Sequence, residues 1–84
     1  MASVTLEVIM DHKIDWTAKA KGLLKSELKK RDLTYAQLVE KLRELGVIEN
    51  EPNIRNKIAR GGFTAVFLLQ CLAAVGAHTL HLEN

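Results

Sequence analysis

Residues 53–60 carry the side chains with the clearest capacity for molecular recognition. Four amide or cationic side chains recur at the helical spacing i, i+3, i+4 and i+7 and would share one face of a helix: Asn53, Asn56, Lys57 and Arg60. This face contains no carboxylate. In the major groove of duplex DNA, Asn can form two hydrogen bonds with adenine, and Arg two with guanine. The four residues are therefore predicted base contacts, although the pattern also suits the solvated face of a surface helix.

A second set of residues is predicted to contact the DNA backbone. They lie at the ends of expected helices or beside the candidate base contacts, and they are Thr34, Tyr35, Arg55, Thr64 and Lys30. Free N–H groups at a helix N-terminus bind phosphate, and lysine and arginine supply positive charge. Two alternatives stay open: Tyr35 could pack on Leu33 or Leu38, and the cations near Lys30 could simply stabilise the end of a helix.

Other chemistry finds little support in the sequence. Cys71 lies in an apolar stretch, so we expect a buried cysteine that acts as a small hydrophobe and not as a nucleophile. His78 and His81 would lie on opposite faces of a strand, so no metal site is predicted. The sequence has no glycine-rich phosphate loop after a strand and no carboxylates paired for acid–base work. We therefore expect a protein that is not an enzyme and has no cofactor or small-molecule substrate.

Composition and charge predict one small globular domain over residues 1–84. Of the 84 residues, 48% are hydrophobic and 26% are charged. The formal net charge is only +2, but the cations are concentrated in residues 19–31 and 52–62, which suits a polyanionic partner. The single cysteine excludes an internal disulfide, and no apolar run approaches the ~20 residues of a membrane span. These features predict a cytoplasmic protein with no membrane partner.

The elements that would position the candidate residues are mainly helical. Apolar periodicity and capping residues predict helices over residues 15–31, 34–45, 51–60 and 64–75. Thr34 and Gln37 have the spacing of a capping box. Trp16 and Leu45 fall on the apolar stripes of the first and second helices and are expected in the core. The helix over 64–75 is apolar almost all round, which predicts burial on every side, in part against a second subunit.

The two ends of the chain show a different pattern. Apolar and polar residues alternate over residues 3–9 and again over 79–82, which predicts two short strands. Paired with each other, within one chain or between two, they would add a small β element to the helices.

The stretch from Thr34 to Gly76 resembles the lambda-repressor-like helix-turn-helix domains of the Cro and repressor type. The likeness is carried by the capped helix TYAQLVEKL, the segment IARGGF and the segment FTAVFLLQCLAAVG. The string NIRNKIARGGFTAVFLLQCLAAVG, with DWTAKAKGLLKSELKKR before it, is also similar to a small bacterial family of unknown function. The resemblance covers about residues 15–82. It departs from the helix-turn-helix pattern where Arg43 stands at the usual glycine position and the helix runs on to Gly46.

The resemblance implies a DNA-binding fold and a small transcriptional regulator of bacterial or phage type. With the candidate contacts, it predicts sequence-specific binding of duplex DNA by the helix over 51–60. We expect a homodimer, because one such helix contacts few base pairs and dimers read two half-sites. The alternative is a protein-interaction or adaptor module that uses the apolar helix over 64–75 and the terminal strands. DNA binding would weaken steeply with salt, whereas an apolar protein interface would not.

Overall fold

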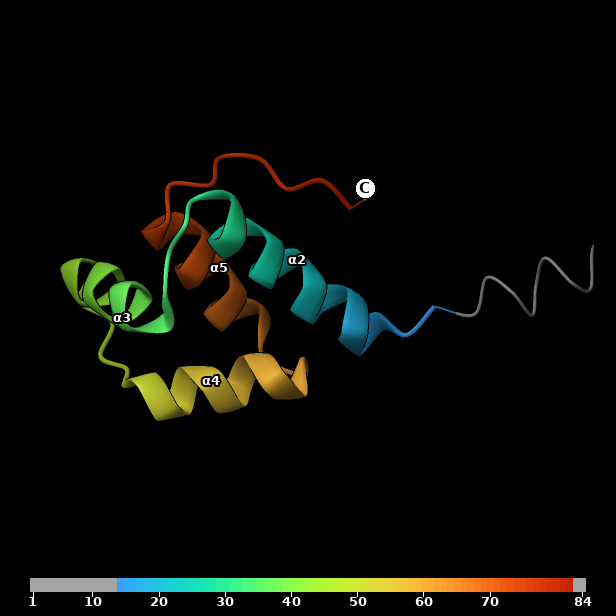
Figure 1. Ribbon diagram of the computed structural model, residues 1–84, viewed down its shortest axis with the longest axis horizontal. Helices are drawn as coiled ribbons and strands as arrows, with labels where there is room; N and C mark the ends of the chain where they lie inside the picture. Colours follow the sequence, from blue (N-terminus) through green and yellow to red (C-terminus); the bar gives the residue numbers. More distant parts are fainter. Residues whose placement is uncertain (1–13, 83–84) are drawn as a thin grey trace, which may run out of the picture.

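The computed structural model describes residues 14–82, which contain four α-helices. They are α2 (Trp16–Lys30), α3 (Tyr35–Glu44), α4 (Glu51–Arg60) and α5 (Ala65–Ala74). In Figure 1, α2 and α5 lie next to each other, α3 lies at one end, and α4 runs along one edge of the molecule. The predicted mainly α class is confirmed, and each helix lies within the range predicted for it.

Local side-chain caps determine where the helices begin. Thr34 Oγ1 accepts a hydrogen bond from Gln37 N at 3.1 Å, and Gln37 Oε1 accepts one from Thr34 N at 2.8 Å, which confirms the capping box. Asn50 Oδ1 caps α4 by accepting a bond from Asn53 N at 2.9 Å. Thr64 Oγ1 caps α5 in the same way. Each cap satisfies an N–H group that has no partner inside its own helix.

The C-terminal end of α4 packs closely on the first half of α2. Gly61 ends α4 with φ of +71°, and an added Cβ there would lie 2.5 Å from the backbone oxygen of Thr17. The ammonium group of Lys21 donates a hydrogen bond to the carbonyl of Ala59 at 3.3 Å. Only glycine combines the positive φ with so close an approach. The contact therefore fixes the position of α4 against α2.

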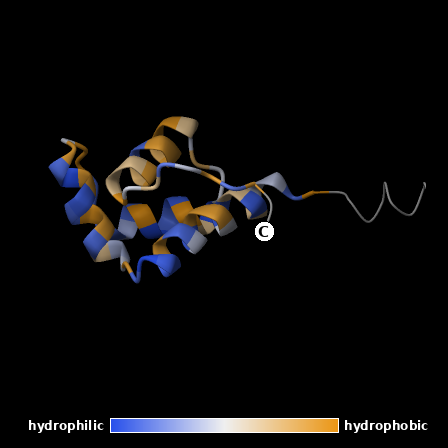
Figure 2. Cartoon of the chain, turned by 90° about the horizontal axis from the view of Figure 1, so that it is seen from above, coloured by the Kyte–Doolittle hydropathy of each residue, from blue (hydrophilic) through white to orange (hydrophobic). Residues whose placement is uncertain are grey.

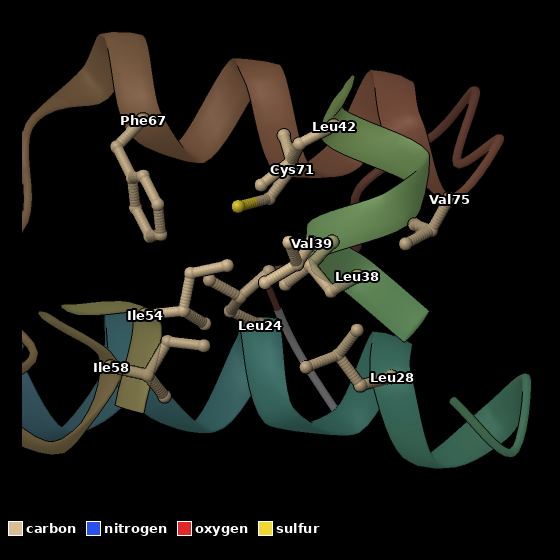
Figure 3. Close-up of a cluster of buried hydrophobic side chains, with 10 residues drawn as sticks. All are labelled: Leu24, Leu28, Leu38, Val39, Leu42, Ile54, Ile58, Phe67, Cys71 and Val75. Carbon is tan, nitrogen blue, oxygen red and sulfur yellow. The ribbon is translucent and has the colours of Figure 1, made fainter. Parts of the chain in front are cut away.

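The core lies between the helices and draws side chains from all four (Figure 3). Its buried members are Leu24, Leu28, Leu38, Val39, Leu42, Ile54, Ile58, Phe67, Cys71 and Val75. Cys71 is fully buried, as predicted. Burial raises the pKa of its thiol to about 12, with the Glu49 carboxylate adding to this effect. A thiol with so high a pKa stays protonated and is a poor nucleophile.

Two residues predicted to lie in the core are exposed instead. Trp16 is 68% exposed, and Leu45 is 51% exposed. The buried apolar residues of α2 lie in its second half, at Leu24 and Leu28, so the first turn with Trp16 projects past the core. Leu45 is the C-cap of α3, where the backbone leaves helical geometry and the helical periodicity no longer predicts the direction of a side chain.

The helix α5 is only partly covered within the described residues. Phe67, Cys71 and Leu72 are buried, but Val66 is 63% exposed and Leu69 is 65% exposed. In Figure 2 most of α5 is coloured as hydrophobic, whereas hydrophilic and hydrophobic residues alternate along the other helices. Within one copy, α5 is therefore buried on one side, and the burial of its other side against a second subunit is still a prediction. An apolar strip of α5 faces outward.

The predicted β element is not supported. Residues 79–82 form no strand, and the predicted strand over 3–9 lies outside the described residues. After α5, Ala77 N donates a hydrogen bond to Leu72 O at 2.9 Å, and Ala77 packs against the core. A strand needs a neighbouring strand for its hydrogen bonds, and residues 14–82 supply none. None of the helices in this range is long and apolar enough to cross a membrane.

Candidate nucleic-acid interface

The helix α4 has one buried side and one fully exposed side. Ile54 and Ile58 are completely buried against the neighbouring helices α2 and α3. Asn53, Asn56 and Arg60 are exposed on the other side, since they lie about 100° or more around the helix from both isoleucines. Within residues 14–82, none of these three side chains takes part in a hydrogen bond or an ion pair. We call Asn53, Asn56 and Arg60 the outer face of α4.

Lys57, the fourth predicted base contact, lies apart from the outer face. Its ammonium nitrogen is 2.5 Å from Glu49 Oε2 and 4.9 Å from the centre of the Phe67 ring. It therefore points toward the segment before α4 and toward α5. Of the four residues predicted to share one face, three therefore make no side-chain hydrogen bond or ion pair within residues 14–82. The fourth, Lys57, makes internal contacts.

The acidic residues at the start of α4 are each paired with a cation of the same helix. Glu49 pairs with Lys57, and Glu51 Oε1 lies 2.7 Å from the guanidinium of Arg55. Arg55, a predicted phosphate contact, is exposed but would have to share its guanidinium with Glu51. Arg60 is left as the cation of α4 that has no acidic partner within residues 14–82.

The N-terminus of α3 combines a helix start with positive charge. The hydroxyl and N–H groups of Thr34 are used in the capping box, so the first helical residues, Tyr35 and Ala36, carry the N–H groups that have no acceptor within the helix. The Tyr35 ring is partly buried against the core, in agreement with the packing alternative. Beside it lies a shallow groove of about 490 Å³, and Lys25 and Lys29 of α2 contribute to its lining.

Lys30, another predicted phosphate contact, belongs to an ion-pair cluster. Its ammonium and the guanidinium of Arg31 each lie 2.9 Å from a carboxylate oxygen of the buried Glu27. The hydrogen bond from Lys30 is the largest of the causes that lower the pKa of Glu27, and Arg31 reinforces it against the opposing effect of burial. Lys25 and Lys29, in contrast, have no ion-pair partner within residues 14–82. Lys29 belongs to the group of cations near Lys30 that the sequence offered for phosphate contact, whereas Lys25 was not selected. The i+3 and i+4 spacing of Lys30 and Arg31 from Glu27 is a visible signal that these two cations are paired.

Thr64 occupies a similar position to Thr34, at the start of α5. Its hydroxyl oxygen accepts a hydrogen bond from Phe67 N at 3.0 Å, which leaves the N–H groups of Ala65 and Val66 without acceptors in the helix. Figure 1 places this end of α5 near the C-terminal end of α4. The predicted phosphate contact of Thr64 would therefore be made by the backbone of the first turn and not by the capping hydroxyl.

The remaining surface offers no clear centre for other chemistry. A second groove, of about 550 Å³, lies between α5 and the segment that follows it, with Leu69, Leu72 and His78 in its lining. Within residues 14–82, no three His, Cys, Asp or Glu side chains lie close enough together to hold a metal ion.

The fold and the outer face define a small helical domain that exposes amide and cationic side chains on α4. The chain belongs to a family described as a domain of unknown function (DUF6471), whose pattern matches residues 16–80. This range includes all four described helices. No curated protein and no solved structure matches the chain. The family description assigns no activity.

Proposed function

We propose that this protein binds duplex DNA, with α4 in the major groove, and acts as a small transcriptional regulator. One observation carries the proposal: on one side of α4, Asn53, Asn56 and Arg60 are exposed, and their side chains make no hydrogen bond or ion pair with the rest of residues 14–82. The carboxylates of Glu49 and Glu51 at the start of the helix are paired with its own cations. The outer face therefore offers hydrogen-bond donors and acceptors without unpaired negative charge.

The chemistry of the outer face suits base edges. An asparagine amide can pair with N6 and N7 of adenine, and an arginine guanidinium with O6 and N7 of guanine. With 10 residues, α4 is about 15 Å long. An α-helix with its side chains is about 10–12 Å in diameter, which fits a major groove that is about 12 Å wide. We assign base contacts to Asn53, Asn56 and Arg60.

Backbone phosphates would be held by the surroundings of α4. The unsatisfied N–H groups at the starts of α3 and α5, near Tyr35 and Thr64, are suited to phosphate oxygens. Lys25 and Lys29 add positive charge beside the first of these sites. Arg55 and Lys30 would contribute less, because each already pairs with a carboxylate.

We further propose that the DNA-binding form is a homodimer. A single helix in the groove contacts few base pairs, and dimers of helix-turn-helix proteins read two half-sites about 34 Å apart. The exposed Val66 and Leu69 of α5 supply apolar surface for contact between two copies. The resemblance to lambda-repressor-like domains, which are DNA-binding regulators, favours the same conclusion.

The test is fluorescence anisotropy of a labelled random duplex at about 50 and 200 mM salt. We expect micromolar affinity that falls by decades between the two salt concentrations, because several phosphates are neutralised. Arg60→Ala should weaken binding, and on a selected site the loss should be about 1–3 kcal/mol. Arg43→Ala is the matched control, since Arg43 is an exposed arginine paired with Glu40 on α3. The absence of binding at low salt would overturn the proposal.

A protein-interaction module is the second candidate, and it is favoured by the exposed apolar residues of α5. Large exposed apolar groups such as Val66 and Leu69 are typical of contact surfaces when they adjoin one another. Binding of a protein partner at this strip should persist at about 200 mM salt, because apolar contacts are not screened. It should be lost in Leu69→Lys but kept in Arg60→Ala. The opposite pattern would assign the function to α4.

A further inference from the structure

Three parts of the molecule meet at the ammonium group of Lys57. The side chain starts in the second half of α4, reaches the carboxylate of Glu49 just before the helix, and lies over the ring of Phe67 in the first turn of α5. The Phe67 ring in turn lies 5.6 Å from the Phe63 ring, centre to centre. One side chain thus connects the segment before α4, the helix itself and α5.

The contacts of Lys57 are partly shielded from solvent. The Glu49 side chain is only 10% exposed, the Lys57 side chain is 43% exposed, and Phe67 is buried. Solvent and salt screen such a pair less than a pair on the open surface. A cation over an aromatic face is also stabilised when it is partly desolvated. The carboxylate of Glu49 is close enough to Cys71 to raise the pKa of the buried thiol, so the pair adjoins the core.

The position of these contacts matters because of how α4 is otherwise held. Ile54 and Ile58 pack toward α2 and α3, and Gly61 fixes the C-terminal end on α2. Lys57 adds two further contacts. One is with Phe67 of α5, and the other is with Glu49 in the segment that leads into the first turn of α4. These contacts together define the rotation of α4 about its own axis, and that rotation sets the direction of the outer face.

We propose that Lys57 is a positioning residue, which contacts Glu49 and Phe67 and thereby orients the outer face of α4, and that it does not contact DNA bases itself. This inference rests on the proposed function for its affinity readout. Glu49 would then support the binding of a polyanion although it is acidic, because its contact with Lys57 helps to orient the outer face.

Glu49→Gln gives the sharpest test, because the two possible roles of Lys57 predict opposite signs. If Lys57 positions α4, removing its partner should weaken binding of duplex DNA by about tenfold, within the range that coupled neighbours show. If Lys57 contacts DNA directly, Glu49→Gln should strengthen binding, since a negative charge is removed and a cation is released. Glu40→Gln is the matched control: it removes an exposed carboxylate that pairs with Arg43, and it should change the affinity by less than about twofold.

The second test is a double-mutant cycle with Lys57→Met, which keeps an unbranched apolar stem. We expect Lys57→Met, Glu49→Gln and the double variant each to lose about tenfold in affinity, because all three break the same contact. The dependence of log Kd on log salt concentration should keep its slope. A combined loss of about a hundredfold, or a slope smaller by about 0.9 in Lys57→Met, would overturn the proposal, because that change in slope corresponds to one lost phosphate contact.

A third readout needs no DNA and separates this inference from the proposed function. Amide hydrogen exchange at Ile54 and Ile58 should accelerate by at least about threefold in both Lys57→Met and Glu49→Gln, and Lys57→Arg should restore most of the protection. If the wild-type chain binds no DNA but exchange follows this pattern, the proposed function fails and the positioning role stands. Unchanged exchange in both variants would refute the positioning role.

Discussion

The polar side chains of α4 fall into two groups that differ in how far they are already engaged. In the first group, Lys57 and Arg55 lie about 160° apart, one on each flank of the buried isoleucines, and are paired with Glu49 and Glu51. In the second group, the exposed Asn53, Asn56 and Arg60 make no side-chain hydrogen bond or ion pair within residues 14–82. The helix thus carries polar groups that are engaged within the fold and polar groups that are available to a partner.

The type of a residue and its place in the helical repeat therefore do not by themselves identify a binding residue. Asn56 and Lys57 are neighbours in sequence and both polar, yet one is exposed and unengaged and the other joins three elements. The available side chains are the better candidates for recognition, because an internal contact must be broken before an engaged group can bind a ligand.

The largest expected effect concerns the contact that holds α4 on α2. Gly61→Ala should lower the free energy of unfolding by about 3 kcal/mol, from the strain of a positive φ and the overlap with Thr17. Urea denaturation monitored by circular dichroism measures this loss. Gly46→Ala is the matched control, because Gly46 has φ of +81° but open space around it. Equal losses in the two variants would show that the close approach to α2 contributes nothing to stability.

An intermediate effect is expected at Glu27, which is engaged by two cations on α2. Its lowered pKa means that the carboxylate stabilises the fold above its ordinary pKa of 4.5, and that this contribution is lost as the pH falls through the lower pKa of the folded state. Glu27→Gln should therefore reduce stability at pH 7 by about 1 kcal/mol. The difference from the wild type should shrink on acidification. Thermal unfolding at about pH 7 and pH 3 measures both; a difference that is independent of pH would contradict the account.

The smallest effect is expected at Arg55, on the flank of α4 opposite Lys57. Its pair with Glu51 is exposed and spans one helical turn, so Arg55→Ala should reduce the free energy of unfolding by only about 0.3–0.5 kcal/mol. Its effect on DNA affinity should be smaller than that of Arg60→Ala, because Arg55 is paired with Glu51 whereas Arg60 has no acidic partner within residues 14–82. Anisotropy titrations of the two variants in parallel test this order, and a larger loss for Arg55→Ala would reverse our assignment of the two groups.

The parts of the fold that sequence predicted well depend on local contacts. The caps at Thr34, Asn50 and Thr64 each join residues three positions apart. The sequence indicates the caps at Thr34 and Thr64, but for α4 it allows either Asn50 or Glu51. The burial of Ile54 and Ile58 follows from helical periodicity in the same way. These local rules located all four helices of the described residues to within one residue at each end.

The parts that sequence did not predict depend on contacts distant along the chain. The spacing of residues 53–60 placed Lys57 with the outer face, yet its angle of about 60° from Ile54 on a helical wheel indicates a position at the edge of the core. Its partner Phe67 becomes a neighbour only through the packing of α5. Residues 79–82 have the alternation of a strand but no strand beside them within residues 14–82. Whether the outer face reads DNA bases is still a prediction.

The most direct test of that prediction is a nuclear magnetic resonance titration of ¹⁵N-labelled protein with duplex DNA. The side-chain NH₂ groups of Asn53 and Asn56 report on the outer face itself, and backbone amides report on every helix. We expect the largest shifts at these two side chains, at Arg60 and at the first backbone amides of α3 and α5, with little change at Leu69 in the middle of α5. Shifts confined to α5, or none at all, would contradict the assignment of the outer face as the recognition surface.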